Sequence, residues 1–300
     1  MFKFISALLL AALMTISISA QITDANFRIF DAKGNPATLE KIIDALKNAD
    51  VVFLGEQHDD AAAHFLQAEI FKKTFENYGK ERGVALSLEM FERDVQIVLD
   101  EYLQNLISEN HFLLSSRAWN NYKTDYRPLI EFAKENHLPV IAANAPRRYV
   151  NMVSRGNRET LNQLSPQAKS WLAPLPYGEP SKNYTDKFNA LMGGMPESSA
   201  GPGKILASQS LWDATMAHSI SELLKRKKNA LVVHLNGGFH SESRLGAVEH
   251  LARYSPKARV LVVTIKTSKE FPDFNKAADE NAGDFVILTD PKLPRSFTQK

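Results

Sequence analysis

The chain alternates short, continuously apolar runs with longer segments whose apolar residues recur at helical spacing. Six apolar runs are rich in β-branched residues and cover residues 51–55, 84–90, 139–145, 230–238, 259–265 and 284–290. Continuous rather than alternating apolarity indicates strands buried on both faces. Between these runs, segments with helical spacing cover residues 61–79, 92–106, 127–137 and 210–227. This order predicts an α/β fold with a mostly parallel central sheet and helices on both faces.

Residues 165–204 depart from this pattern. They hold six of the fourteen prolines and five of the fourteen glycines, together with several aromatic residues and methionines. A long irregular stretch inside a compact domain is typical of a lid, a binding loop or a linker. The aromatic residues and methionines argue against a plain linker, so we expect a lid-like insertion within a single domain of residues 21–300.

The first twenty residues have the pattern of an export signal. A cationic tip, Met1-Phe2-Lys3, is followed by an apolar stretch and then by small residues that end at Ala20. We therefore expect residues 1–20 to be cleaved. The chain has no cysteine, which excludes disulfides, thiolate metal ligands and a lipid-anchored cysteine. Together these features predict a periplasmic protein that is not a lipoprotein.

Composition narrows the function classes only a little. Of 300 residues, 44% are hydrophobic and 23% are charged, and the formal net charge is +2. These values are ordinary for a globular domain and give no cationic excess for nucleic acid. We therefore expect no nucleic-acid partner.

Polar side chains follow the ends of four predicted strands. Glu56 and His58 follow the first run, Glu89 ends the second, Asn144 the third, and Asn236 and His240 the fourth. In open α/β sheets, ligands bind beyond the carboxyl ends of the strands. The two histidines also share a pattern, because Gly55 and Gly237 each stand three residues before one. We expect these groups to meet in one hollow.

Two helical segments carry further polar residues whose interpretation stays open. Asp60 and His64 are spaced to share one helix face, but Asp60 can be a helix cap and His64 a solvated side chain. Asp213 belongs to a polar stripe beside Trp212, while Ser210-x-x-Asp213 also resembles a capping box.

Aromatic and cationic residues near the third run are candidates for ligand contacts. Tyr126 lies in an aromatic segment with Trp119, and Arg147 and Arg148 follow the end of the third run. Tyrosine can bind ferric iron through its phenolate, and arginine pairs well with carboxylates. Such side chains also commonly belong to a core or to a solvated face.

Taken together, these motifs make the chain resemble the ChaN-like haem-binding family, part of a wider group with Tiki-type and erythromycin-esterase-like proteins. The resemblance covers about residues 50–265. It is carried in order by FLGEQHDDAAAHFLQ, LSLEMFERDVQ, NYKTDYRPLIEFAKENHLPVIAANAPRR, SLWDATMA and HLNGGFHSESRLG. The resemblance implies an α/β fold, haem binding and a role in iron uptake at the bacterial envelope.

Further expectations come with this resemblance. Family members are thought to hold haem iron through a tyrosine, sometimes with two haems facing each other in a dimer. Here the candidate ligands are Tyr126, Tyr177 and Tyr184, with Arg147 or Arg148 near the propionates. A homodimer and envelope iron-uptake components are the expected partners. Many relatives are lipoproteins, a feature this chain cannot share without a cysteine.

Two functions remain open at this point. The first is a periplasmic haem carrier, in which the loop at 165–204 clasps the macrocycle. The second is a hydrolase that uses a divalent metal, zinc or manganese, held by His58, His240, Glu56 and Glu89, with Glu56 or Glu89 as general base. The wider group associates paired Gly-x-x-His motifs with such hydrolysis. A pure partner-binding module would leave the converging polar ends unexplained.

Overall fold

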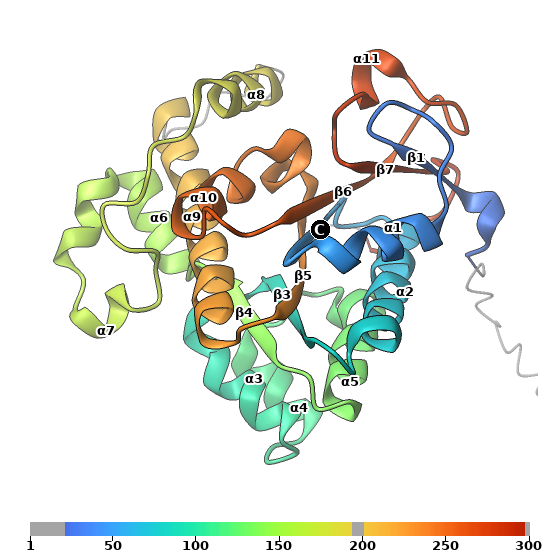
Figure 1. The fold of residues 1–300 in the computed structure, drawn as a ribbon. Coiled ribbons are helices and arrows are strands. Elements are labelled where there is room, and N and C mark those ends of the chain that lie inside the picture. The colour runs from blue at the N-terminus through green and yellow to red at the C-terminus, as the bar shows by residue number, and fades with distance from the viewer. Residues whose placement is uncertain (1–21, 194–200, 298–300) are drawn as a thin grey trace, which may run out of the picture.

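The computed structural model describes residues 22–193 and 201–297, and a single twisted sheet runs through the middle of this part (Figure 1). Its strand order is β1-β7-β6-β2-β5-β3-β4. All neighbouring strands are parallel except β1, which is antiparallel to β7. The strands are β1 Phe27–Asp31, β2 Val51–Glu56, β3 Gly83–Glu92, β4 Val140–Asn144, β5 Ala230–Gly237, β6 Val260–Thr267 and β7 Phe285–Thr289.

Helices cover both faces of this sheet (Figure 1). They are α1 Leu39–Ala45, α2 Ala61–Tyr78, α3 Gln96–Leu103, α4 Glu109–Ser116, α5 Arg127–Glu135, α6 Arg147–Arg155, α7 Pro166–Lys169, α8 Lys182–Met192, α9 Pro202–Arg226, α10 Ala247–Tyr254 and α11 Lys276–Asp279. A π-helical turn at residues 122–126 leads into α5. None of the described helices combines the length and the apolarity needed to cross a lipid bilayer.

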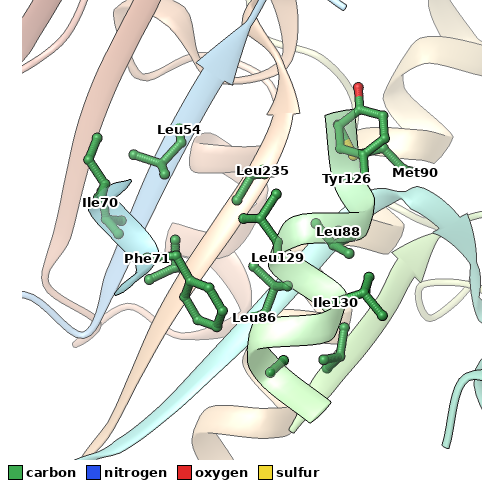
Figure 2. Packing of buried hydrophobic residues seen from close by; sticks show 14 of the residues in the cluster. Leu54, Ile70, Phe71, Leu86, Leu88, Met90, Tyr126, Leu129, Ile130 and Leu235 are labelled. Atoms are coloured by element: carbon green, nitrogen blue, oxygen red, sulfur yellow. The ribbon is translucent and has the colours of Figure 1, made fainter. Parts of the chain in front are cut away.

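The larger core lies between the sheet and helices α1 to α5. Leu54 of β2, Leu86 of β3 and Leu235 of β5 project from neighbouring strands toward Phe71 of α2 and Ile130 of α5, as Figure 2 shows. All five side chains are fully buried. The alternate residues of β2, Val51 and Phe53, point into a second core with α9 and α10. Burial on both faces explains why β2 is apolar at every position.

The structure confirms the predicted fold class. All six apolar runs are strands, and the helical segments at 61–79, 127–137 and 210–227 correspond to α2, α5 and α9. Strand β1 was not among the predicted strands, because it is short, partly exposed and antiparallel at the edge of the sheet. The expected signal peptide at 1–20 lies outside the described residues.

The segment at 165–204 is less irregular than expected. It contains α7, α8 and the start of α9, while residues 194–200 lie outside the described part. Leu172, Ala173 and Tyr177 are buried against α6 and α9. The described portion of this segment is therefore packed onto the domain, and its role as a lid stays a prediction.

Candidate functional site

Four adjacent strands end on the same side of the molecule, as the sequence predicted. The order β2-β5-β3-β4 places the carboxyl ends of these strands next to one another. Glu56, Glu89, Asn144 and Asn236 all lie at these ends and are buried. Burial of so many polar groups requires internal partners.

His58 forms the first histidine–carboxylate pair. Its Nδ1 donates to Glu56 Oε1 at 2.9 Å, while its Nε2 has no hydrogen-bond partner among the described residues. The side chain is 32% exposed. Its ring packs edge-to-face on Trp119, with ring centroids 4.9 Å apart. A Cβ on Gly237 would lie 2.9 Å from the Nε2 atom, so glycine is needed there to leave room for the ring.

His64 extends this pair inward. Its Nδ1 lies 3.1 Å from Glu56 Oε2, and its Nε2 lies 3.3 Å from Asp125 Oδ2 and 3.1 Å from the carbonyl oxygen of His58. The ring is buried, so the alternative of a solvated His64 is wrong. Asp60 caps α2, because its carboxylate accepts from the backbone N–H groups of Ala62 and Ala63.

His240 forms the second pair with a residue that the sequence analysis did not place at the site. Its Nδ1 donates to Asp213 Oδ1 at 2.8 Å, and the hydroxyl of Tyr184 donates to Asp213 Oδ2. Asp213 lies in the middle of α9, which begins at Pro202, so the capping-box alternative is wrong. A carboxylate buried in a helix interior needs such a partner, and the polar stripe at Asp213 was the available signal.

Glu89 lies between the two pairs. Its Oε1 is 3.7 Å from His240 Nε2, and its Oε2 accepts from the backbone N–H of Gly237 at 2.6 Å. The structure therefore confirms the prediction that distant segments bring His58 and His240 to one place. The charge of Glu89 raises the pKa of both imidazoles.

The carboxylates determine the charge states of the imidazoles. Burial lowers the pKa of His240, but the charges of Asp213 and Glu89 outweigh it and raise the pKa to about 9. His64 follows the same balance, with Glu56 and Asp125 raising its pKa to about 9. Burial works against Glu56, yet His64 and His58 bring its pKa down to about 2. A carboxylate with so low a pKa is a poor proton acceptor, which weakens its case as a general base.

The candidate tyrosine ligands are all buried and all donate to protein oxygens. Tyr126 donates to Glu56 Oε1 at 2.6 Å, Tyr184 to Asp213, and Tyr177 to the carbonyl oxygen of Ala207 at 2.8 Å. Burial raises the pKa of each of these hydroxyls. Each would have to leave its acceptor and lose its proton before it could bind iron as a phenolate.

The two candidate arginines differ in their surroundings. Arg148 pairs with Asp94 Oδ2 at 2.5 Å and lies over the ring of Trp171. Both arginines are exposed, and the guanidinium carbon of Arg147 lies 5.9 Å from the centre of the Trp119 ring, which packs on His58. Arg147 is therefore the one that borders the open side of the site.

The two asparagines at the strand ends have local roles. Asn144 accepts from the backbone N–H of Ala145, and Asn236 donates to the carbonyl oxygen of Gly237 and to Ser241 Oγ. These bonds hold the turns after β4 and β5. They engage one end of each amide, while Asn236 Oδ1 is buried without a hydrogen-bond partner among the described residues.

The expected divalent-metal site is not supported. Within residues 22–193 and 201–297, no group of three or more His, Cys, Asp or Glu side chains is arranged to hold a metal ion. His58 and His240 each give Nδ1 to their own carboxylate, and one oxygen of Glu89 is engaged by a backbone N–H. The four predicted ligands therefore lie near one another, but they do not form a common ligand set for zinc or manganese. They are His58, His240, Glu56 and Glu89.

Comparison with known proteins agrees with this fold. ChaN of Campylobacter jejuni, whose solved structure shows cofacial haem binding to that protein, superposes with a TM-score of 0.67 at 19% sequence identity. The match covers 89% of this chain and 98% of that one. A mutant of the erythromycin esterase EreC in its open conformation reaches a TM-score of only 0.49 at 12% identity, over 88% of this chain and 83% of that one.

Sequence comparison gives the family. Chloroplastic RETICULATA-RELATED 5 of Arabidopsis thaliana is 25% identical over 283 residues, which cover 86% of this chain. The chain spans only 37% of the length of that plant relative. The profile of the family described as haem-binding uptake, Tiki superfamily, ChaN matches residues 42–251. Since that match covers more than two thirds of the sequence, the chain belongs to the ChaN family of haem-binding uptake proteins.

Proposed function

We propose that this protein binds haem at the open side of the His58 pair and serves in haem or iron acquisition. The observation that carries the proposal is the free Nε2 of a partly exposed imidazole, in a chain of a haem-binding family. Its ring partner, Trp119, and the neighbouring Arg147 border the same opening. Haem, as the cargo, supplies a ferric iron that accepts an imidazole or phenolate ligand.

His58 fits the role of an axial ligand better than the predicted tyrosines do. Its Nδ1 donates to Glu56 at 2.9 Å, which fixes the tautomer whose Nε2 can bind iron once its proton is lost. Burial lowers the pKa of His58, but Glu56 and Glu89 outweigh it and raise the pKa, so iron competes with a proton for Nε2. A carboxylate on the other ring nitrogen also makes an imidazole a stronger donor. Tyr126 and Tyr184, in contrast, already donate to buried carboxylates.

Trp119 and Arg147 supply the remaining contacts that haem requires. The macrocycle is apolar and planar, so an indole at the opening gives it a surface to pack on. The exposed guanidinium of Arg147 suits a propionate, because arginine pairs with carboxylates in a planar fork. Arg148 is held by Asp94 and is the less available of the two predicted partners.

The cellular setting is part of the same proposal. Residues 1–20 would direct export and be removed, leaving the mature protein in the periplasm without a lipid anchor. There it would pass haem to envelope iron-uptake components, as a monomer or as a homodimer. Mass spectrometry of the N-terminus from a periplasmic fraction tests the cleavage, and ultracentrifugation with and without hemin tests the dimer.

A hemin titration tests the binding site. We expect the mature protein to shift the Soret band at one hemin per chain, and His58→Ala to weaken binding by about 100-fold, because the iron loses its ligand. The matched control is His111→Ala, which removes an exposed imidazole on α4 and should leave the titration unchanged.

Two outcomes would count against parts of this proposal. Free-hemin spectra at stoichiometric protein would refute haem binding altogether. A charge-transfer band typical of phenolate-bound ferric haem, lost in Tyr126→Phe and kept in His58→Ala, would instead support the predicted tyrosine ligand. In that case haem binding stands, and the assignment of His58 is wrong.

A further inference from the structure

A cavity lies on the sheet edge formed by β4. It has a volume of about 950 Å³ and is bounded by α3, the end of α5 and the C-terminal part of α9. Its apolar wall includes Leu103, Leu138, Val140 and Leu223. The strand-end site does not include any of these residues, so the cavity is separate from the proposed haem site.

The cavity lining carries many cationic side chains for a protein with a net charge of +2. Arg93, Lys134, Arg226 and Lys227 line it, and Asp100 is the one carboxylate among its lining residues. That carboxylate already accepts from Gln96 Nε2 at 2.9 Å. A concave surface with this charge attracts anions.

Arg93 is the cation of the cavity whose guanidinium has a buried nitrogen without a partner. Its Nη1 donates to Ser219 Oγ at 2.6 Å, its Nε is buried without a hydrogen-bond partner, and no carboxylate of the described residues pairs with the guanidinium. Burial and the charge of Arg226 lower its pKa, and Glu222 offsets this in part. A partly buried guanidinium with an unpartnered nitrogen and no paired carboxylate is costly unless a ligand completes it.

The backbone edge of β4 is already covered, which limits what can bind beside it. The side-chain amide of Gln96 donates to the carbonyl oxygen of Val140 at 2.8 Å and accepts from the N–H of Ala142 at 2.7 Å. Gln96 thus takes the hydrogen bonds that an added peptide strand would need. A peptide that extends the sheet does not fit this groove.

From these contacts we propose that the β4 edge cavity binds an amphipathic carboxylate, a molecule with an apolar body and one carboxylate that pairs with Arg93. The planar fork of a guanidinium matches the two oxygens of a carboxylate. The leucine and valine wall receives the apolar body, and the lysines and Arg226 add a favourable field. The proposal does not depend on haem binding at His58.

The test uses cis-parinaric acid, a fluorescent long-chain carboxylic acid, titrated into the mature full-length protein. We expect saturable binding that weakens by about tenfold or more in Arg93→Gln, because a charged hydrogen-bonded pair is lost. Methyl parinarate has no carboxylate. It should bind the unaltered protein no more tightly than the acid binds Arg93→Gln. Arg155→Gln, which removes an exposed arginine at the end of α6, is the matched control and should bind as the unaltered protein does.

A second variant protects the test against misfolding of Arg93→Gln. Arg226 lines the same cavity. Arg226→Gln should weaken binding by about threefold, because it removes a positive charge that attracts the carboxylate but not the arginine that pairs with it. Equal binding of acid and ester, or unchanged binding in Arg93→Gln with a normal melting temperature, would overturn the proposal, as would no binding at all. The Soret titration of Arg93→Gln should be unchanged, which separates this result from the haem proposal.

Discussion

The two sides of the strand-end site are built alike but differ in access. His58 and His240 each give Nδ1 to a buried carboxylate, and each carboxylate also accepts from a tyrosine hydroxyl. The side chain of His58 is 32% exposed and has a free Nε2, whereas that of His240 is 8% exposed with Nε2 near Glu89. Burial, rather than local hydrogen bonding, therefore decides which imidazole can receive a ligand.

Removing either carboxylate should change the free energy of unfolding more than any other substitution considered below. The size of each loss shows which side of the site contributes more to stability. Glu56→Ala leaves His64 and His58 without their shared partner, and we expect the free energy of unfolding to fall by about 3–5 kcal/mol at pH 6. Asp213→Ala should cost less, because His240 keeps Glu89 at 3.7 Å. Urea unfolding measures both. The reverse order would show that Glu89 contributes nothing to His240.

The pH dependence of stability should come next in size. The pKa values of His64 and His240 rise from 6.5 to about 9 on folding, so their stabilisation is complete below pH 6.5 and is lost as the pH rises toward 9. Glu56 acts at the other end, since its pKa of about 2 is below its ordinary 4.5, and its contribution is lost as the pH falls through that range. We expect a plateau between about pH 4.5 and 6.5, and an alkaline loss on the order of 2 kcal/mol for each histidine.

Melting curves of single variants assign that alkaline loss to one side or the other. His64→Gln should remove the part that comes from the Glu56 side, and His240→Gln the part from the Asp213 side. If both variants keep the full alkaline decline, neither histidine is the group that titrates.

Replacing the tyrosine hydroxyls compares the two sides through smaller changes in stability. Tyr126→Phe and Tyr184→Phe each remove a hydrogen bond to a buried carboxylate, and we expect each to cost about 1.5 kcal/mol. Tyr177→Phe is the control, because its hydroxyl donates to the neutral carbonyl of Ala207 and should cost less. A larger loss in Tyr177→Phe than in the other two would contradict this comparison. Chemical denaturation provides the values.

The strands were readable from sequence because burial on both faces leaves a continuous apolar run. The same rule places Glu56, Glu89 and His240 at strand ends from the sequence alone. The order of strands was not readable, because pairing of β2 with β5 and β6 depends on contacts across about two hundred residues. The short edge strand β1 lacks such a run and was missed.

The partners of the histidines were harder to find than the histidines themselves. Asp213 fits a capping pattern locally, and only the full length of α9 shows that it stands in a helix interior. Asp125, the other partner of His64, lies in a π-helical turn. The sequence gives no clear signal for such a turn. Local spacing identifies which residues are polar, but the pairing of buried charges is decided by tertiary contact.

The smallest change in stability should come from the glycine that makes room for His58. In Gly237→Ala the new Cβ would lie 2.9 Å from His58 Nε2, so the ring must tilt, and we expect about tenfold weaker hemin binding with a stability loss of about 1 kcal/mol. Gly238→Ala is the matched control, because its Cβ would meet its nearest neighbour, the carbonyl oxygen of Glu56, at 3.4 Å. Hemin affinity and urea unfolding are measured on both. Unchanged hemin affinity in Gly237→Ala would mean that the iron does not bind at His58 Nε2. A methyl group against Nε2 must disturb any ligand that is bound to this atom.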